Sequence, residues 1–235
     1  MILGIVGAME VEVDALKNAM KDPLPVLYAG MEFYSGSLEG VDAVVVKCGV
    51  GKVNAAMCTQ ILCDCFGVTH LVNTGIAGSL DEELRIGQMV VSCAVLHHDF
   101  DCTTFGYAPN QIPGMPEFFM PEWNLVRLAV QAADEGGVGT LRSGIVASGD
   151  QFISDSATKQ RIKETTRALC VEMEGAAIAQ TAFRNGVPFV IIRAISDNAD
   201  DCAEFDYPSF EEQTARRCAQ FILQFAKQLS AESLD

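Results

Sequence analysis

Short runs of β-branched and apolar residues alternate along this chain with longer segments of helical composition. This alternation constrains the fold most, because buried strands separated by helical segments are typical of layered α/β proteins. The predicted strands are residues 2–6, 43–47, 70–73, 89–95, 143–147 and 189–195. The predicted helices are residues 10–20, 53–65, 122–133, 156–166, 173–184 and 209–229. Ser156 and Ser209 are candidate N-caps, and Gly67 and Gly186 are candidate C-caps.

Size and composition predict a single domain over residues 1–235. The chain has 235 residues, and 49% of them are hydrophobic, which gives enough apolar surface to offset the entropy lost on folding. Lys and Arg number 16 against 31 Asp and Glu, so the formal net charge is −15. Because nucleic acids and most membrane surfaces are also negative, we expect neither of them as a partner.

The cysteines and the apolar runs favour a cytoplasmic protein. None of the nine cysteines belongs to a C-x-x-C pair, and a domain of this size needs no disulfides to hold its core. The longest apolar runs, such as residues 187–192, are far shorter than the roughly 18 residues of a membrane-spanning helix. The first residues lack the positive segment of a secretory signal, so we expect reduced thiols and a cytoplasmic location.

Two segments depart from the alternation. Residues 36–41 combine glycine with polar residues and predict a turn between two antiparallel strands. Residues 99–121 are irregular and contain four prolines and five aromatic residues. A loop of this length in a compact domain is usually functional or covered by a partner.

Acidic residues follow several predicted strands at the point where each strand ends. In an open α/β sheet, ligands bind outside the carboxyl ends of the strands, so such side chains would share one rim. Glu10 and Glu12 follow the first strand, Glu172 and Glu174 follow residue 170, and Asp197 follows the last strand. The convergence of several carboxyl groups on one rim predicts an active site.

Each of these acids also has a purely structural interpretation. Acids in the first turn of a helix, where Glu10 and Glu12 would lie, are favoured by the helix dipole. Asp197 could be the N-cap of the next segment. Glu172 and Glu174 share a face only in extended backbone, so a helix beginning there would leave at most one of them in a pocket.

Other motifs do not meet the requirements of cofactor or metal sites. Residues 49–52 (GVGK) lack the Ser/Thr and the leading glycine of a phosphate-binding loop, and residues 4–7 lack the spacing of a dinucleotide fingerprint. His97 and His98 are adjacent at a strand end, where their side chains point in opposite directions, and the third histidine is the distant His70. No G-x-S-x-G elbow is present. We therefore expect neither a cofactor nor a metal.

Six segments taken together resemble the 5′-methylthioadenosine/S-adenosylhomocysteine nucleosidase family of the purine nucleoside phosphorylase superfamily. In family order and spacing they are residues 4–12 (GIVGAMEVE), 49–52 (GVGK), 73–78 (NTGIAG), 148–153 (SGDQFI), 171–176 (VEMEGA) and 193–197 (RAISD). The resemblance implies a three-layer α/β/α fold with a central mixed sheet. It also implies a homodimer that hydrolyses the N-glycosidic bond of adenine nucleosides without cofactor or metal.

The resemblance assigns chemical roles to the acids. Asp197 matches the general acid that protonates adenine N7, which requires a carboxyl group kept protonated by desolvation. Glu12 matches the general base for the attacking water, and Glu174 matches the group that binds the ribose hydroxyls. Arg193 and Glu172 are expected to orient Glu12 and the water.

The resemblance also implies how the nucleoside is bound. The purine would stack on Phe152, and the 5′ substituent would occupy an apolar slot that includes Phe210. The substrate-binding residues implied are Met9, Val50, Ile76, Ala77, Gly78, Phe152, Ile153, Val171, Glu172, Met173, Arg193, Ser196 and Phe210. The neighbouring subunit would contribute Phe105, Tyr107 and Pro113. Ile76 departs from the serine that many members carry near the water position.

Three alternative functions remain open at this point. A phosphate-dependent nucleoside phosphorylase would share the scaffold, but a phosphate site needs converging cations and this chain is strongly negative. A non-catalytic nucleoside-binding protein would not need Glu12, Glu174 and Asp197 together. Among substrates, methylthioadenosine, S-adenosylhomocysteine, 5′-deoxyadenosine and 6-amino-6-deoxyfutalosine all fit an apolar slot that is open to solvent.

Overall fold

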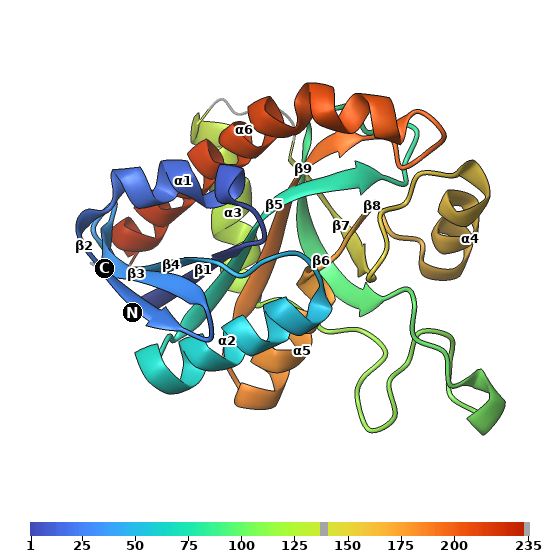
Figure 1. The fold of residues 1–235 in the computed structure, drawn as a ribbon, viewed down its shortest axis with the longest axis horizontal. Helices are drawn as coiled ribbons and strands as arrows, with labels where there is room; N and C mark the ends of the chain where they lie inside the picture. Colours follow the sequence, from blue (N-terminus) through green and yellow to red (C-terminus); the bar gives the residue numbers. More distant parts are fainter. Residues whose placement is uncertain (137–140, 233–235) are drawn as a thin grey trace.

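The predicted strands belong to one mixed β-sheet that runs through the molecule (Figure 1). A computed structural model describes residues 1–136 and 141–232. The strands of this described part are β1 Ile2–Gly7, β2 Lys21–Tyr28, β3 Met31–Leu38, β4 Val41–Lys47, β5 His70–Ser79, β6 Met89–His97, β7 Leu141–Ser148, β8 Cys170–Glu172 and β9 Phe189–Asp197. The helices are α1 Glu10–Ala19, α2 Lys52–Phe66, α3 Trp123–Gly136, α4 Ser156–Thr166, α5 Gly175–Asn185 and α6 Ala203–Glu232, with a 3₁₀ turn at Thr103–Phe105.

The sheet is open at one end and closed on itself at the other. Its order is β2-β3-β4-β1-β5-β8-β7-β6-β9, and β9 pairs a second time with β5. Strands β4, β1, β5 and β9 are parallel, so their carboxyl ends meet at one edge. Strand β8 runs antiparallel to the end of β5, with Val171 opposite Gly78, and so returns Glu172 toward the same edge. This topology brings the strand ends that carry the predicted acidic residues to one edge of the sheet.

Helices cover both faces of the sheet and bury a separate core on each. Strand β1 sends Leu3 and Ile5 to one face and Val6 to the other, as the period of a strand requires. Helices α1, α3 and α6 pack on the first face, and α2 and α5 pack on the second (Figure 1). The expected three-layer α/β/α arrangement is therefore confirmed.

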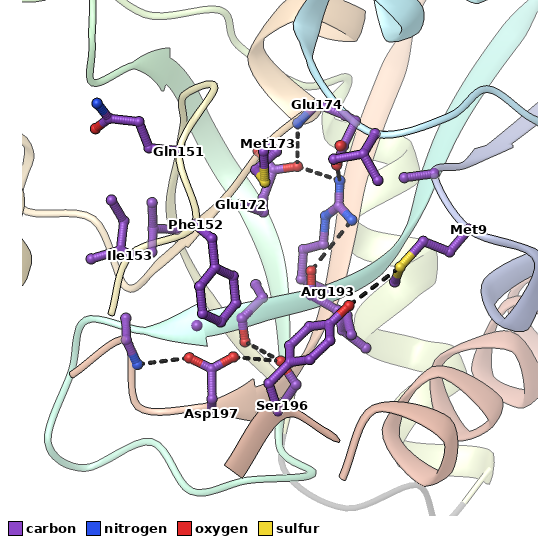
Figure 2. A pocket seen from close by; sticks show the side chains of 18 of the residues that line it. Met9, Gln151, Phe152, Ile153, Glu172, Met173, Glu174, Arg193, Ser196 and Asp197 are labelled. Atoms are coloured by element: carbon purple, nitrogen blue, oxygen red, sulfur yellow. Dashed lines mark hydrogen bonds and ion pairs between the residues drawn. The ribbon is translucent and has the colours of Figure 1, made fainter. Parts of the chain in front are cut away.

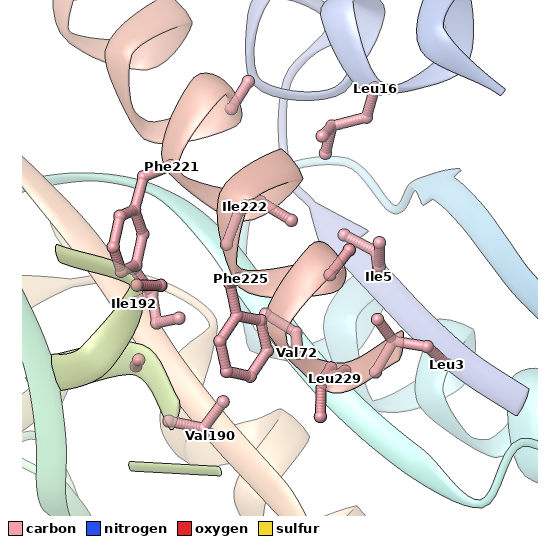
Figure 3. Packing of buried hydrophobic residues seen from close by; sticks show 14 of the residues in the cluster. Leu3, Ile5, Leu16, Val72, Val190, Ile192, Phe221, Ile222, Phe225 and Leu229 are labelled. Atoms are coloured by element: carbon pink, nitrogen blue, oxygen red, sulfur yellow. The ribbon is translucent and has the colours of Figure 1, made fainter. Parts of the chain in front are cut away.

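Helix α6 is the largest contributor to the first core. Phe221, Ile222, Phe225 and Leu229 are buried and point from one side of the helix toward the strands (Figure 3). Their spacing of three or four residues is that of an amphipathic helix face. Figure 3 shows this face over Val72 and the other buried side chains of β1, β5 and β9. Within the described residues, no helix has the length and apolar character needed to cross a membrane.

Three strands, β2, β3 and β8, lie outside the predicted strand ranges. Strand β3 was implied only by the predicted turn, and the absence of the other two has a physical reason. Strand β2 contains Pro23 and Pro25 and is exposed along its whole length, which only an edge strand tolerates. Strand β8 is three residues long, too short to show a period. The predicted turn between two antiparallel strands is found at residues 39 and 40, which is shorter than the predicted 36–41, because β3 continues to Leu38 and β4 begins at Val41.

The helix boundaries confirm some predicted caps and correct others. Gly67 and Gly186 adopt the left-handed conformation at the ends of α2 and α5, as expected. Asp155, not Ser156, caps α4, because its side chain accepts a hydrogen bond from the Thr158 N–H at 2.8 Å. Ser209 lies inside α6 and donates a hydrogen bond to the Phe205 carbonyl, so it is not an N-cap.

Candidate functional site

A cavity opens at the edge of the sheet where β1, β5 and β9 end (Figure 2). Every residue predicted for this chain's own site lines it, with the exception of Phe210. The lining residues are Ala8, Met9, Glu12, Val50, Ile76, Ala77, Gly78, Gln151, Phe152, Ile153, Val171, Glu172, Met173, Glu174, Arg193, Ser196, Asp197, Ala199 and Tyr207. Mostly apolar walls with a few convergent polar groups are typical of small-molecule sites.

The Arg193 guanidinium is the centre of the polar cluster. It is 1% exposed and forms an ion pair with Glu172, and it lies 3.5 Å from Glu174 Oε2 and 4.0 Å from Glu12 Oε1. It also donates a hydrogen bond to the Asn73 side chain. Three carboxyl groups from two distant segments of the chain therefore share one buried positive charge, and the cluster is negative overall when they are ionised.

Glu12 is held by backbone donors from two segments. Its Oε2 atom accepts hydrogen bonds from the N–H groups of Ala8 at 2.7 Å and Met9 at 3.0 Å, and its Oε1 atom accepts from Ile76 at 3.1 Å. Burial raises the pKa of Glu12, and the Arg193 charge and these donors oppose the rise. The result is a fixed, buried carboxyl group that is a stronger base than an exposed one.

The position of Glu12 depends on the space beside Gly75, and it differs from that of the neighbouring acid Glu10. Gly75 has a φ of +153°, and a Cβ atom there would lie 2.3 Å from Glu12 Oε1 and from Arg193 Nη1, so only glycine leaves room for the cluster. Glu10, which shares the first helical turn with Glu12, is exposed and pairs with Lys17. Glu10 therefore has only the structural role, whereas Glu12 both caps the start of α1 through the Met9 N–H and lines the cavity.

Both carboxylate oxygens of Glu172 are hydrogen-bonded within the protein. Its carboxylate accepts hydrogen bonds from the N–H groups of Glu174 and Gly175 and from the Ser148 hydroxyl, in addition to the Arg193 ion pair. It therefore binds the start of α5 and fixes Arg193. Its oxygens are occupied by these donors, so any effect on Glu12 acts through Arg193.

Glu174 faces the cavity because α5 begins at Gly175 and leaves residue 174 non-helical. Both Glu172 and Glu174 line the cavity for this reason, although a helix beginning at residue 173 would have separated them. The Glu174 Oε1 atom accepts a hydrogen bond from the Gly51 N–H at 2.8 Å. Burial raises the pKa of Glu174, with a further contribution from the charge of Glu172, while Arg193 opposes the rise.

Asp197 lies apart from the Arg193 cluster, below the Phe152 ring in Figure 2. It is 2% exposed, and its two oxygens contact the Ala199 N–H and the Ser196 hydroxyl, each at 2.8 Å. Burial raises the pKa of Asp197 above its ordinary value, and the charges of Asp206 and Asp200 add to the rise. Such a carboxyl group can hold a proton and donate it.

One aromatic residue that lines the cavity, Tyr207, was not predicted from the sequence. Tyr207 from α6 lies edge-on to Phe152, with ring centroids 5.3 Å apart, and its hydroxyl donates a hydrogen bond to Met9 Sδ at 3.3 Å. It occupies the place predicted for Phe210, which does not line the cavity. Phe210 was assigned to the slot by the family resemblance, and residues 207 and 210 are almost one helical turn apart on α6.

The residues expected to act on a neighbouring subunit lie away from this cavity. Phe105 is 79% exposed, Tyr107 is 38% exposed and Pro113 is also exposed, and none of the three lines the chain's own site. Residues 99–121 extend from the body of the molecule as an irregular segment around the Thr103–Phe105 turn (Figure 1).

The two adjacent histidines, His97 and His98, are buried in the protein. The Nε2 atom of His97 is 3.0 Å from the Gln180 side-chain oxygen, and the ring nitrogens of His98 are buried without a hydrogen-bond partner. Among residues 1–136 and 141–232, no three His, Cys, Asp or Glu side chains are grouped so that they could hold a metal ion.

Comparison with known proteins identifies the family. The model of the phosphorylase superfamily matches residues 2–229. A 5′-methylthioadenosine/S-adenosylhomocysteine nucleosidase of Shewanella frigidimarina is 42% identical over 97% of this chain and its own whole length, and that of Geobacillus thermodenitrificans is 44% identical over 93% of each. The chain belongs to this nucleosidase family. The resemblance seen in the sequence motifs is therefore confirmed.

Solved structures agree with this assignment. The nucleosidase of Colwellia psychrerythraea in complex with adenine has a TM-score of 0.94 at 39% identity, covering 97% of this chain and 96% of its own. The Streptococcus pneumoniae nucleosidase with the transition-state inhibitor MT-ImmA has a TM-score of 0.93 at 35% identity, covering 97% and 100%. A futalosine hydrolase of Helicobacter pylori has a TM-score of 0.92 at 31% identity, covering 96% and 97%. The predicted nucleoside phosphorylase-like fold is confirmed.

The raised pKa of Asp197 predicts a pH-dependent effect on stability. The folded state disfavours the ionised carboxyl, so its contribution to stability is fully present below the unfolded pKa near 4 and is lost as pH rises through the folded pKa. Asp197→Asn cannot ionise, so its Tm should gain on that of the unsubstituted chain as the pH rises from 4 to 8. The expected gain is about 2–4 °C for each kcal/mol relieved.

Asp101→Asn is the matched control for this measurement. Asp101 is exposed, and hydrogen bonds from Thr103 lower its pKa, so its loss should give no gain at high pH. Equal Tm differences for Asp197→Asn at pH 4 and pH 8 would contradict the raised pKa of Asp197.

Proposed function

We propose that this protein hydrolyses the N-glycosidic bond of 5′-methylthioadenosine and S-adenosylhomocysteine, and of 5′-deoxyadenosine. The products are adenine and the 5-substituted ribose. One observation carries the proposal: a single cavity contains a buried carboxyl with a raised pKa beside an aromatic face, and a separate buried carboxyl fixed by backbone donors. The names of relatives that are 40–44% identical to this chain support it.

Asp197 acts as the general acid in this proposal. Adenine leaves poorly as an anion, so proton transfer from Asp197 to N7 lets the electron pair of the C1′–N9 bond move into a neutral purine. Phe152 offers a partly exposed ring for stacking, and the backbone of Ile153 lies beside it to read the adenine edge. The Ser196 hydroxyl holds one Asp197 oxygen in place.

The negative cluster around Arg193 stabilises the ribose as the bond breaks. The sugar develops oxocarbenium-like positive charge, which a negative and largely dry surrounding favours. Glu174 accepts hydrogen bonds from the ribose hydroxyls. Glu12 accepts a proton from the water as the water oxygen attacks C1′, which completes the hydrolysis. Glu12 then returns this proton to solvent.

Ile76 contributes through its backbone rather than its side chain. A serine hydroxyl at this position would give the water one polar contact, and isoleucine does not. The Ile76 N–H instead holds Glu12 Oε1 at 3.1 Å, so the position of the base does not depend on the side chain at residue 76.

The 5′ substituent has a mostly apolar surface available. Met9, Val50, Met173 and Tyr207 line the part of the cavity left after the acids are assigned, and methionine and aromatic side chains make favourable contacts with a thioether. A 6-amino-6-deoxyfutalosine would fit the same open end, and the Helicobacter pylori futalosine hydrolase shares the fold. The higher identity to the nucleosidases favours methylthioadenosine and S-adenosylhomocysteine.

The other two alternatives are less consistent with the cavity. Arg193 is the single basic residue among those that line it, and three acids surround it, so the cavity offers no site for a phosphate dianion. A phosphorylase is disfavoured for this reason. A binding protein would not require both a raised-pKa acid and a fixed base beside the aromatic face.

We propose further that the active unit is a homodimer in the cytoplasm. Val53, Met57 and Phe183 expose apolar side chains on α2 and α5, near a groove that also includes Phe100 and Ile112 of the irregular segment. Exposed apolar side chains grouped in this way mark interaction surfaces. All nine cysteines are free thiols, which suits a reducing compartment.

Replacement of the two proposed catalytic residues tests the mechanism. Asp197→Asn cannot donate the proton and Glu12→Gln cannot accept one, so each should lower kcat for methylthioadenosine by about 10²–10⁴-fold. Adenine release is measured at pH 7, with circular dichroism to show that each variant is folded. Turnover by Asp197→Asn at the original rate would exclude Asp197 as the acid.

Mixing two defective chains tests the proposed exchange of residues between subunits. A chain with Asp197→Asn and a chain with Phe105→Glu should each be inactive alone. A mixed dimer contains one site with both original residues, so random mixing should restore about one quarter of the original activity. No recovery, or a light-scattering mass near the 25.3 kDa of one chain, would contradict the shared site.

A further inference from the structure

The Asp99 side chain, directly after β6, joins two loops of the cavity through a closed set of contacts. Its Oδ1 atom accepts a hydrogen bond from Lys52 Nζ at 2.6 Å, and its Oδ2 atom accepts from the Asp150 N–H at 2.9 Å. Asp150 Oδ1 in turn accepts from the Lys52 N–H at 2.8 Å. We call Asp99, Lys52 and Asp150 the 99–52–150 ring.

Each loop in this ring carries part of the proposed nucleoside site. Lys52 begins α2, and the residue before it, Gly51, donates its N–H to Glu174 Oε1 at 2.8 Å. Asp150 precedes Gln151, Phe152 and Ile153, which all line the cavity. The ring therefore sets the position of the ribose-binding carboxylate relative to the purine-stacking face.

The second loop is held from its other side by His98. The His98 N–H donates to the Ser148 carbonyl at 2.9 Å, and its ring lies against Gly149, where an added Cβ atom would be 2.3 Å from His98 Nε2. Burial lowers the pKa of His98, so its ring stays neutral. The backbone at Gly149 and Asp150 therefore lies between the buried His98 imidazole on one side and the Asp99 carboxylate on the other.

Within the 99–52–150 ring, the ion pair between Lys52 and Asp99 is partly sheltered from solvent, whereas the Asp150 side chain is half exposed. The side chains of Lys52 and Asp99 are each 20% exposed. Burial alone would raise the pKa of Asp99, but the hydrogen bonds from Lys52 and the Asp150 N–H, together with the lysine charge, outweigh it and the pKa lies below its ordinary value. Ion pairs that are fully exposed on a protein surface usually contribute little to stability. The structural alternative is that Lys52 and Asp99 form such a surface pair with no role in the site.

We propose that Asp99 and Lys52 are positioning residues that hold the purine-stacking loop and the Glu174-binding turn in register for the nucleoside. The inference rests on the proposed function, because it takes an adenine nucleoside as the occupant of the cavity. Asp99 is also the first residue of the segment 99–121, so the ring links the base of that segment to the chain's own site. This gives a role to the H-H-D-F-D motif, which the proposed chemistry leaves unused.

Kinetics of Asp99→Asn in the full chain test the proposal. An asparagine keeps one acceptor but loses the charge that holds Lys52, while Asp197 and Glu12 are untouched. The KM for methylthioadenosine should rise about 10-fold with kcat within about twofold, and the Kd for adenine measured by calorimetry should rise in parallel. Asp99→Glu, which keeps the charge, should recover part of the loss.

A double-mutant cycle separates a ring from two independent residues. Lys52→Met should resemble Asp99→Asn, and the double variant should be no worse than either single one, because the same contact is lost in each. The matched control is Asp101→Asn, which removes an exposed carboxylate two residues away that contacts Thr103 and should leave KM unchanged.

Several results would overturn the positioning role. They are an unchanged KM in Asp99→Asn, a fall in kcat at constant KM, or additive effects in the double variant. Adenine binding distinguishes this failure from a failure of the proposed function. If the original chain binds adenine but releases none from nucleosides, the reaction is wrong and the adenine Kd of Asp99→Asn still decides the role of the ring. If the original chain binds no adenine, both proposals fall.

Discussion

The buried charge of Arg193 is the interaction on which the site depends. One guanidinium that is 1% exposed holds carboxyl groups from the start of α1, from the end of β8 and from the residue before α5. A buried charge is costly unless it is paired and hydrogen-bonded, so these segments must meet in one arrangement. Glycine at position 75 is part of the same requirement, because any side chain there would collide with the cluster. The closed end of the sheet supplies this arrangement by pairing β5 with both β8 and β9.

The carboxyl groups of the cavity differ in function because their partners differ. Glu172 is occupied by backbone, hydroxyl and guanidinium donors, which makes it structural. Glu12 and Glu174 are held by backbone N–H groups and share Arg193 at longer range. Among the residues that the structure describes, no cation forms an ion pair with Asp197, and burial raises its pKa. An acid and a base can therefore coexist in one cavity, which is what proton-assisted cleavage of a glycosidic bond requires.

Much of this could be predicted from the sequence, and the failures have physical causes. Strand periodicity and helix composition predicted the layers, and the acids at strand ends predicted the rim, because both depend on local pattern. Strand β2 was missed because its prolines are tolerated only at an edge, a tertiary property. Tyr207 was missed because the resemblance assigned Phe210 to the slot, and which residue of α6 lines the cavity depends on how the helix packs. The hydrogen bonds and the ion pair of Glu172 involve Ser148 and Arg193. These two residues are distant from Glu172 in the sequence, so no local pattern predicts the contacts.

The central claim is that water, rather than phosphate, attacks the sugar in a cavity whose lining offers a single cation among acids. The most direct test is adenine release from methylthioadenosine by the purified protein in phosphate-free buffer, repeated with phosphate added. The account predicts the same rate in both buffers, with free methylthioribose as the second product. Release that occurs only with phosphate and yields the sugar 1-phosphate would contradict it.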